Sequence, residues 1–311
     1  MLLTTDAHQL PPITGGFSLR QTRVLLAALG HSPRKPLGQN FLVDANIVQK
    51  SLQLAEVAPG DIVVEIGPGL GTLTAALLAA GATVFAVERD PRLARYLREW
   101  LGAAYPGKFS LVEGDAVAFP LAGLAVMGER FKVVANLPYA ISTPWIDAVL
   151  ENGVLPTQMV VMLQREAAER FTAGSGAGKA TGAISIAIEA AFERAPGCEV
   201  SSSCFFPPPH VDSRLLHLRR RAAPRHLRVE TRQILRGVFS HRRKQLGAAF
   251  RLLPEISPLA LTWLSRLQEW GVSPQVRPEK IPFAAWLALD DIFNASRKPP
   301  FFPLSKFAAA D

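Results

Sequence analysis

The chain has 311 residues, of which 49% are hydrophobic and 19% charged, and its formal net charge is +8. This composition supports one domain with a buried core and a smaller second domain. The apolar stretches are too short for membrane spans, residues 1–16 do not resemble a secretory signal, and two cysteines do not make a disulfide framework. We expect reduced thiols and therefore a cytoplasmic protein. No Cys/His cluster has ligand spacing, so we expect no metal site. The positive net charge favours a polyanionic partner.

Two short helices are predicted near the start of the chain. Ser18 and Gln21 have the spacing of a capping box, apolar residues follow at helical intervals, and Gly30 ends the first helix. Asp44 is placed to cap the second helix.

A basic segment connects these two helices. Arg34 and Lys35 precede the polar and aromatic residues 37–42. We expect this segment to fold over a ligand, with the two basic side chains contacting phosphates. A solvated linker is the alternative interpretation.

A strand, a turn, a helix and a second strand follow in the order of a nucleoside-binding unit. Residues 62–66 are apolar and rich in β-branched side chains, which is typical of a buried parallel strand. Residues 72–80 are strong helix formers that stop at Gly81, and residues 83–87 form the second strand. This strand leads to Glu88, whose carboxylate can accept hydrogen bonds from both ribose hydroxyls.

The turn after the first of these strands has an unusual glycine spacing. Gly67, Gly69 and Gly71 fall at every second position, and Glu65 stands two residues before the first glycine. The turn has neither dinucleotide spacing nor a phosphate-binding Lys-Ser/Thr ending, so it suits a nucleoside without phosphate. S-adenosylmethionine is the obvious candidate, and a glycine-rich turn without a ligand is the alternative.

The next two predicted strands also end in polar residues. A helix over residues 91–101 begins with proline, and a strand over residues 109–112 leads to Asp115. Asp115 can accept a hydrogen bond from an adenine amino group or cap a helix, and spacing does not separate the two. The strand over residues 131–135 ends at Asn136.

The four residues Asn136-Leu137-Pro138-Tyr139 give the sharpest catalytic signal. An adenine amine is a poor nucleophile because its lone pair is delocalised into the ring. The Asn136 side-chain oxygen and the Leu137 carbonyl can accept its two N–H groups and direct the lone pair at a methyl group. Pro138 fixes the turn, and Tyr139 offers a ring for the base to stack on. An ordinary strand-ending turn is the alternative.

The remaining elements of the first domain are less sharply defined. We expect a helix over residues 143–150, strands over residues 159–163 and 214–218, and a core segment over residues 184–192. The glycine-rich residues 172–181 form a loop that closes over substrate or is a disordered surface loop. Phe205 precedes a stiff proline segment that could hold its ring in a pocket, and a core position is the alternative.

The composition changes at Arg219. Eleven basic residues and one acidic residue fall between Arg219 and Arg251, so the polyanion-binding character is concentrated there. Three helices are expected here, with apolar faces at Ile234, Leu235, Val238 and Phe239, at Leu261, Leu264 and Leu267, and over residues 283–293.

Taken together, these motifs resemble the small-subunit ribosomal RNA adenine dimethyltransferases, which are class I S-adenosylmethionine-dependent enzymes that doubly methylate two adjacent adenosines. The resemblance runs from about residue 22 to residue 293. It is carried by six motifs, at residues 37–42, 65–71, 114–116, 136–139, 205–209 with 211–213, and 239–244.

The resemblance implies an α/β fold. We expect a Rossmann-like seven-stranded class I methyltransferase sheet whose last hairpin breaks the parallel order, over residues 1–221. A small, basic, all-helical RNA-docking domain would follow over residues 222–311. The implied partner is small-subunit ribosomal RNA within an immature subunit, and we expect a monomer.

The resemblance also implies roles for individual residues. The S-adenosylmethionine site would comprise Asn40, Leu42, Gly67, Gly69, Glu88, Asp115 and Asn136. The catalytic group would comprise Asn136, Leu137, Pro138, Tyr139 and Phe205, with the target adenine between the last two rings. The RNA-binding residues would be Arg34, Lys35, Arg242, Arg243 and Lys244.

Two departures from the family pattern affect RNA contacts rather than chemistry. His210 stands where the family usually has lysine, and Thr181 begins a Thr-Gly-Ala run where an aromatic-Gly pair is common. Two alternatives remain: a macrolide-resistance type methylase acting on large-subunit RNA, and a non-catalytic assembly or transcription factor. The motifs at residues 239–244 and 211–213 favour the small-subunit enzyme.

Overall fold

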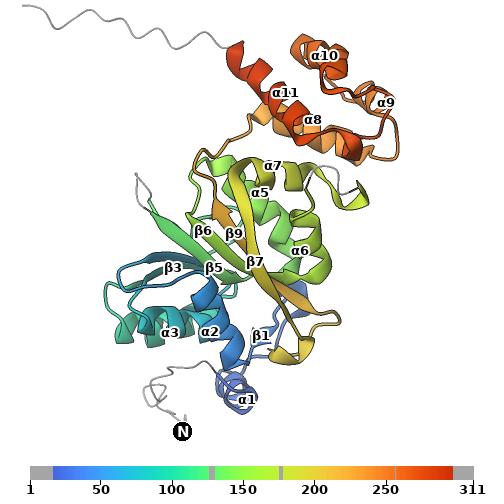
Figure 1. Ribbon diagram of the computed structural model, residues 1–311. Helices are drawn as coiled ribbons and strands as arrows, with labels where there is room; N and C mark the ends of the chain where they lie inside the picture. The colour runs from blue at the N-terminus through green and yellow to red at the C-terminus, as the bar shows by residue number, and fades with distance from the viewer. Residues whose placement is uncertain (1–16, 126–129, 175–177, 256, 297–311) are drawn as a thin grey trace, which may run out of the picture. The chain divides into compact units, whose positions relative to one another are not determined.

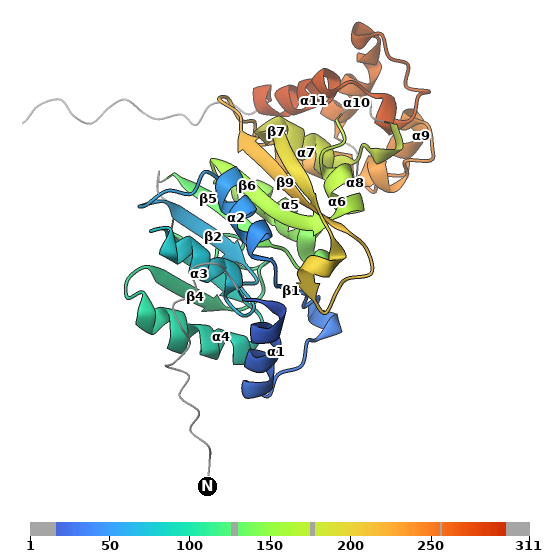
Figure 2. The same ribbon diagram turned by 60° about the horizontal axis from the view of Figure 1, so that its bottom comes forward.

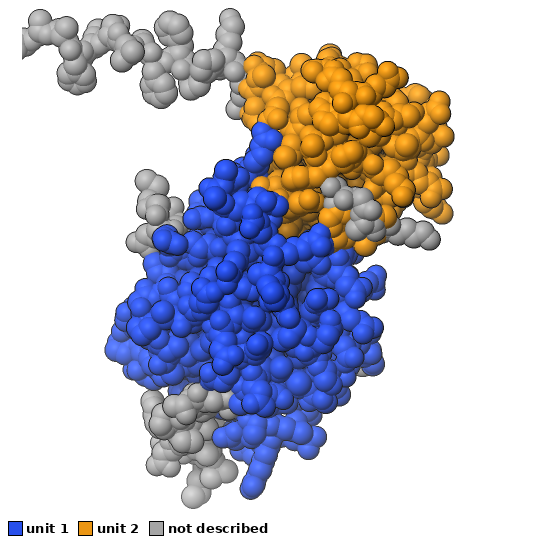
Figure 3. Space-filling model, viewed as in Figure 1, with its two compact units in different colours: residues 1–172, 191–226 blue, residues 173–190, 227–311 orange. Residues whose placement is uncertain are grey.

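The computed structural model describes residues 17–125, 130–174, 178–255 and 257–296 (Figure 1). These residues belong to two compact units, coloured separately in Figure 3. The first unit runs to Thr172 and resumes over Ala191–His226, and the second contains Ala173–Ala190 and the chain from Leu227 onward. Our predicted division at residue 221 did not anticipate that residues 173–190 pack with the C-terminal helices.

The first unit is built around a seven-stranded sheet, as predicted. Its strands lie in the order β4 (Phe109–Glu113), β3 (Thr83–Glu88), β2 (Ile62–Ile66), β5 (Phe131–Asn136), β6 (Gln158–Gln164), β9 (Ser213–Arg220) and β7 (Phe192–Val200). The first five strands are parallel, whereas β9 is antiparallel to both of its neighbours. The carboxyl ends of β2 to β5 therefore meet at one edge.

Helices cover both faces of this sheet (Figures 1 and 2). The helices α2 (Ala45–Leu54) and α3 (Thr72–Ala79) lie on one face, and α5 (Ser142–Asn152) and α6 (Arg165–Phe171) lie on the other. Helix α4 (Pro91–Leu97) continues into a π-helical turn over Arg98–Gly102, so the predicted helix 91–101 is confirmed in extent. The strands β2 and β5 are almost wholly buried, which explains their continuous apolar runs.

The segment before the sheet carries both predicted caps. Ser18 and Gln21 form the capping box of α1 (Leu19–Ala28), and Asp44 accepts hydrogen bonds from two backbone N–H groups of α2. A short strand, β1 (Phe41–Leu42), pairs with β8 (Phe205–Phe206), which we did not predict. This pairing places residues 37–42 beside the proline-rich segment.

Strand β7 was missed by the residue pattern, although the resemblance implied a final hairpin. Its sequence includes Glu193, Arg194, Pro196 and Gly197, and a register shift lies between Ala195 and Cys198. The strand is at the edge of the sheet, where a proline costs no ladder hydrogen bond on its open side. The predicted core segment 184–192 forms helix α7 (Ala183–Ala191) and the first residue of β7.

The second unit is helical and has its own aromatic core. It contains α7, α8 (Val229–Ser240), α9 (Leu246–Phe250), α10 (Pro258–Ser265) and α11 (Phe283–Ala295). The rings of Phe250, Trp263 and Trp286 stack in sequence, with centroids 5.7 and 5.0 Å apart. The buried face predicted for α8 is confirmed. The face predicted around α10 is confirmed at Leu267, which is fully buried, but is wrong at Leu261, which is 49% exposed while Trp263 is buried.

Gly71 is required by close packing at the start of α3. Its φ is +82°, and a Cβ there would lie 2.8 Å from Leu97 Cδ2 and 2.9 Å from Trp100 Cζ3. Gly71→Ala should therefore reduce the free energy of unfolding by about 1–3 kcal/mol. Denaturant unfolding measures this, with Gly102→Ala as the control because its Cβ would meet nothing within 4 Å. Equal stability of the two variants would contradict the packing argument.

Candidate functional site

A pocket opens at the carboxyl ends of β2, β3, β4 and β5. It contains about 1060 Å³ of empty space, including its opening to solvent. Its walls come from residues 36–42, the glycine turn, Glu88, Asp115 and the turn after β5. All seven residues predicted for cofactor binding line this pocket: Asn40, Leu42, Gly67, Gly69, Glu88, Asp115 and Asn136. Such a position is where open α/β sheets bind ligands.

The glycine turn is held between two other walls of the pocket. Gly67 and Gly69 have φ values of +65° and +60°. A Cβ on Gly67 would lie 3.4 Å from the Pro138 ring, and one on Gly69 would lie 3.2 Å from the Phe41 ring. The alternating glycines therefore allow close packing of three pocket segments as well as close approach to a ligand.

The Glu88 carboxylate is fixed by backbone donors. Its Oε2 accepts a hydrogen bond from Gly69 N at 3.0 Å, and its Oε1 accepts one from Asp90 N at 2.8 Å. Burial raises the pKa of Glu88, and these N–H groups offset part of that effect. Each oxygen keeps acceptor capacity for a hydroxyl group.

Glu65 is a second acid in the pocket wall, and its side chain is 2% exposed. Its Oε2 has no hydrogen-bond partner among the described residues. Burial raises the pKa of Glu65 to about 8, and the nearby Glu88 carboxylate adds to the shift. The sequence showed this residue two positions before Gly67 but gave no sign of its unpaired oxygen.

This pKa makes stability depend on pH. The pKa of Glu65 is higher in the folded state than the value of 4.5 in the unfolded state. Its contribution to the unfolding free energy is therefore greatest at low pH and falls as pH rises from about 4.5 toward about 8. The loss should be on the order of a few kcal/mol. Glu65→Gln should flatten the fall in unfolding free energy between about pH 5 and about pH 8. Urea unfolding of both proteins at each pH tests this, and parallel pH profiles would contradict it.

Asp115 lies at the pocket wall beyond β4. Its Oδ1 accepts a hydrogen bond from Val117 N at 2.8 Å, and its Oδ2 lies 3.5 Å from Arg89 Nη1. Residues 116–118 form a turn, so the helix that Asp115 was alternatively expected to cap is absent there. The carboxylate therefore closes a turn and still faces the pocket.

Asn136 is oriented by the N-terminal segment. Its Nδ2 donates to the Asn40 carbonyl at 3.1 Å, which leaves Oδ1 as the acceptor on the other side of the amide. Leu137 N donates to Met162 O at 3.2 Å, which fixes the backbone of the same turn to β6. Asn136, Leu137, Pro138 and Tyr139 all line the pocket.

Tyr139 is anchored by the last strand of the sheet. Its hydroxyl and the buried Ser213 Oγ are 2.6 Å apart, and burial raises the pKa of Tyr139. Ser213 belongs to the Val211-Asp212-Ser213 motif, whose role the sequence did not reveal. In the structure this motif has a supporting role: Ser213 holds the Tyr139 hydroxyl, and Asp212 Oδ1 accepts a hydrogen bond from Ser202 N at 3.0 Å.

Phe205 does not line the pocket. It pairs with Leu42 between β1 and β8, is 3% exposed and belongs to the hydrophobic core of the first unit. The structure thus places it in the core position that we gave as the alternative. Stacking of Phe205 on a substrate base stays a prediction.

The predicted RNA-binding residues fall in two places. Arg34 is half-exposed and its Nη1 lies 3.6 Å from Asp90 Oδ2, while the side chain of Lys35 lies outside the described part of the chain. Arg242, Arg243 and Lys244 lie in the turn between α8 and α9 rather than on a helix, and the last two are exposed. Arg232, which we counted with the basic surface, is buried at 5% exposure.

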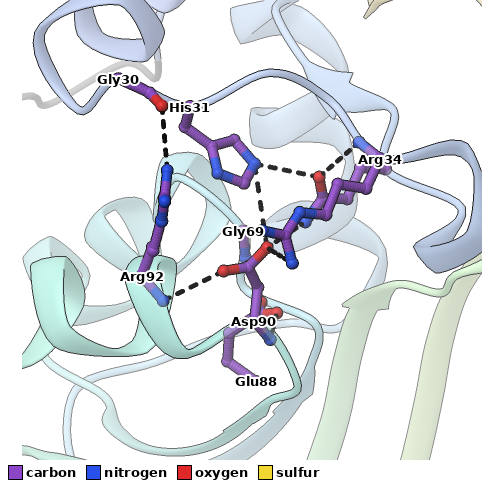
Figure 4. Close-up of polar contacts among 8 residues, drawn as sticks. Gly30, His31, Arg34, Gly69, Glu88, Asp90 and Arg92 are labelled. Atoms are coloured by element: carbon purple, nitrogen blue, oxygen red, sulfur yellow. Dashed lines mark hydrogen bonds and ion pairs between the residues drawn. The ribbon is translucent and has the colours of Figure 1, made fainter.

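The sequence also missed a polar cluster behind the pocket, drawn in Figure 4. Asp90 is fully buried and faces His31, Arg34 and Gln39 from the N-terminal segment. The proximity of Asp90 to Glu88 in the sequence was the sole available signal.

The sheet order and this pocket define a class I methyltransferase fold. A family model described as "Ribosomal RNA adenine dimethylase" matches residues 30–293. The chain therefore belongs to the ribosomal RNA adenine dimethylase family, whose members are enzymes that use a methyl donor.

Similar proteins agree with this family. "Ribosomal RNA small subunit methyltransferase A" from Opitutus terrae is 55% identical over 269 residues, covering 86% of this chain and 96% of the relative. The protein of the same name from Moorella thermoacetica is 41% identical over 274 residues, covering 84% and 92%. A crystal structure of a dimethyladenosine transferase from Plasmodium falciparum has a TM-score of 0.65 and 26% identity, covering 82% of this chain and 98% of that one.

None of the described helices combines the length and the apolar character that crossing a bilayer requires.

Proposed function

We propose that this protein methylates N6 of two adjacent adenosines in small-subunit ribosomal RNA, twice each, with S-adenosylmethionine as methyl donor. The observation that carries the proposal is the placement of the Asn136 acceptor and the Tyr139 ring at one wall of the nucleoside pocket. The names of the relatives from Opitutus terrae and Moorella thermoacetica support the choice of RNA.

The pocket residues fit S-adenosylmethionine. Glu88 keeps an acceptor position on each oxygen for the ribose hydroxyls, and Asp115 would receive the adenine amino group. The buried Oε2 of Glu65, which has no hydrogen-bond partner among the described residues, offers this donor a polar group. When bound, S-adenosylmethionine supplies an electrophilic methyl group.

The residues of the chain then act mainly by positioning. The Oδ1 of Asn136 and the carbonyl of Leu137 would accept the two N–H groups of the target amine and direct its lone pair. Tyr139 would stack on the base, and its bond to Ser213 fixes the ring before substrate arrives. We assign no general base, because the proton can leave the amine after transfer.

The second unit would bind ribosomal RNA through its phosphates. Arg243 and Lys244 are exposed in the turn after α8, where cations can contact a phosphate backbone without reading sequence. We infer that the substrate is an immature small subunit in the cytoplasm and that the protein acts as a monomer.

A methyl-transfer assay separates this proposal from its rivals. Transfer to immature small subunits, giving dimethyladenosine by nucleoside mass spectrometry, is the expected result. The crystal structure of the 23S rRNA methyltransferase ErmE is also similar, with a TM-score of 0.57 and 26% identity, so naked large-subunit RNA is the second substrate to assay. Transfer to that RNA alone would favour the large-subunit reaction, and transfer to neither would favour an assembly factor.

A further inference from the structure

Asp90 is a buried carboxylate that does not line the pocket but is bonded to two of its walls (Figure 4). Its Oδ1 accepts a hydrogen bond from Arg92 N at 3.0 Å and so caps α4. Its Oδ2 accepts a hydrogen bond from Gln39 Nε2 at 3.3 Å, and Arg34 Nη1 and His31 Nε2 lie 3.6 and 3.9 Å from the same oxygen.

Gln39 links His31 and Arg34 to Asp90 through its side-chain amide. Its Oε1 accepts hydrogen bonds from Arg34 N at 2.8 Å and from His31 Nε2 at 3.0 Å. Because Oε1 is occupied by these two donors, the amide cannot rotate, and its Nε2 is left to donate to Asp90. A second link runs from α4, where Arg92 Nη1 donates to Gly30 O at 3.1 Å.

Asp90 is also hydrogen-bonded to Glu88, which belongs to the other wall of the pocket. The backbone N–H of Asp90 donates to Glu88 Oε1, while the segment held by Gln39 continues into Asn40, whose carbonyl orients Asn136. Asp90 is therefore the point at which the ribose-binding acid and the N-terminal wall are joined.

We propose that Asp90 is a positioning residue that holds residues 31–40 closed against β3 and so preorganises the methyl-donor pocket. This inference rests on the proposed function, since it takes the pocket to bind S-adenosylmethionine. Loss of the carboxylate charge would leave Gln39 Nε2 and the Arg34 guanidinium facing a poor partner, and the segment would spend part of its time detached. Apparent affinity then falls by the fraction of molecules that remain closed.

Asp90→Asn is the test variant, because asparagine keeps the Oδ1 cap of α4 and replaces Oδ2 with an N–H donor. Calorimetry with S-adenosylmethionine and with its demethylated product should show binding weakened about tenfold. The kcat at saturating donor should change less than twofold, because Asp90 touches no reacting group. Asp44→Asn is the matched control, since Asp44 also caps a helix, at α2, but has no bond to residues 31–39.

Trypsin gives a readout that does not depend on activity. Cleavage after Arg34 should be faster in Asp90→Asn than in the wild type or Asp44→Asn, because a segment that detaches more often enters the protease active site more readily. Saturating S-adenosylmethionine should slow this cleavage in all three proteins.

If Asp90→Asn fails to fold, Arg34→Gln carries the test, because Arg34 is half-exposed and outside the pocket lining. It should weaken donor binding severalfold. Where Asp90→Asn folds, the double variant should weaken binding by less than the two single effects combined. Unchanged affinity in the folded variants, unchanged cleavage after Arg34 in Asp90→Asn, or equal weakening in Asp44→Asn would overturn the inference. If the wild type binds no donor, the proposed function fails, and the trypsin comparison alone decides whether Asp90 holds the segment.

Discussion

Replacing Asn136 with alanine should lower kcat for adenine methylation by about 10²–10³-fold while donor affinity stays within about threefold. Asn136 Oδ1 is one of two acceptors proposed to direct the amine lone pair, and its Nδ2 bond to Asn40 O holds it in place. Because these acceptors act on the target amine, while donor binding is shared with six other predicted residues, the loss should appear mainly in the chemical step. Single-turnover kinetics with immature small subunits and calorimetry with S-adenosylmethionine measure the two quantities separately.

Asn152→Ala is the control for this experiment, because Asn152 is an exposed residue at the end of α5, away from the pocket lining. It should leave both quantities unchanged. Lost donor binding with an unchanged rate in Asn136→Ala would contradict the assigned role and place Asn136 in donor binding alone.

Neutralising Arg242, Arg243 and Lys244 together should weaken RNA binding and flatten its salt dependence. Each phosphate contact contributes about 0.7–0.9 to the slope of log K against log salt, so three contacts should reduce that slope by about 2–3. The fall in affinity should be greatest at low salt. Filter binding of ribosomal RNA over a salt series measures it, and methylation of saturating RNA should be nearly unchanged.

A triple variant of Lys50, Lys108 and Arg266 removes the same charge from exposed positions outside residues 219–251. It should shift the slope far less than the first triple variant. An identical slope in both variants would mean that net charge governs binding, and it would remove the turn after α8 from the RNA interface.

The sequence by itself determined the central unit of the fold. The β-branched run at residues 62–66, the alternating glycines and the helix formers after them have one compatible local structure, and the structure has it at the same residues. The sequence also puts Glu88, Asp115 and Asn136 at or just beyond the ends of predicted strands, and the carboxyl ends of parallel strands meet at one edge of a sheet. All three residues line one pocket at that edge.

Strand β7 could not be predicted from its own residues. Its pairing with β9 outweighs the low strand propensity of Pro196 and Gly197, and no side chain fits at Gly197, where a Cβ would lie 2.0 Å from Leu215 O. Only contact with a strand about twenty residues away makes this segment a strand.

The contacts that hold the pocket residues in place were likewise decided by tertiary structure. The hydrogen bond between Tyr139 and Ser213, the burial of Phe205 against β1 and the contacts of Asp90 with residues 31–39 all join distant parts of the chain. Local sequence patterns report propensity over a few residues, whereas the partner of a buried polar group depends on which elements pack beside it. The chemistry of the pocket was therefore readable in the sequence, and the groups that hold it in place became visible only in the folded chain.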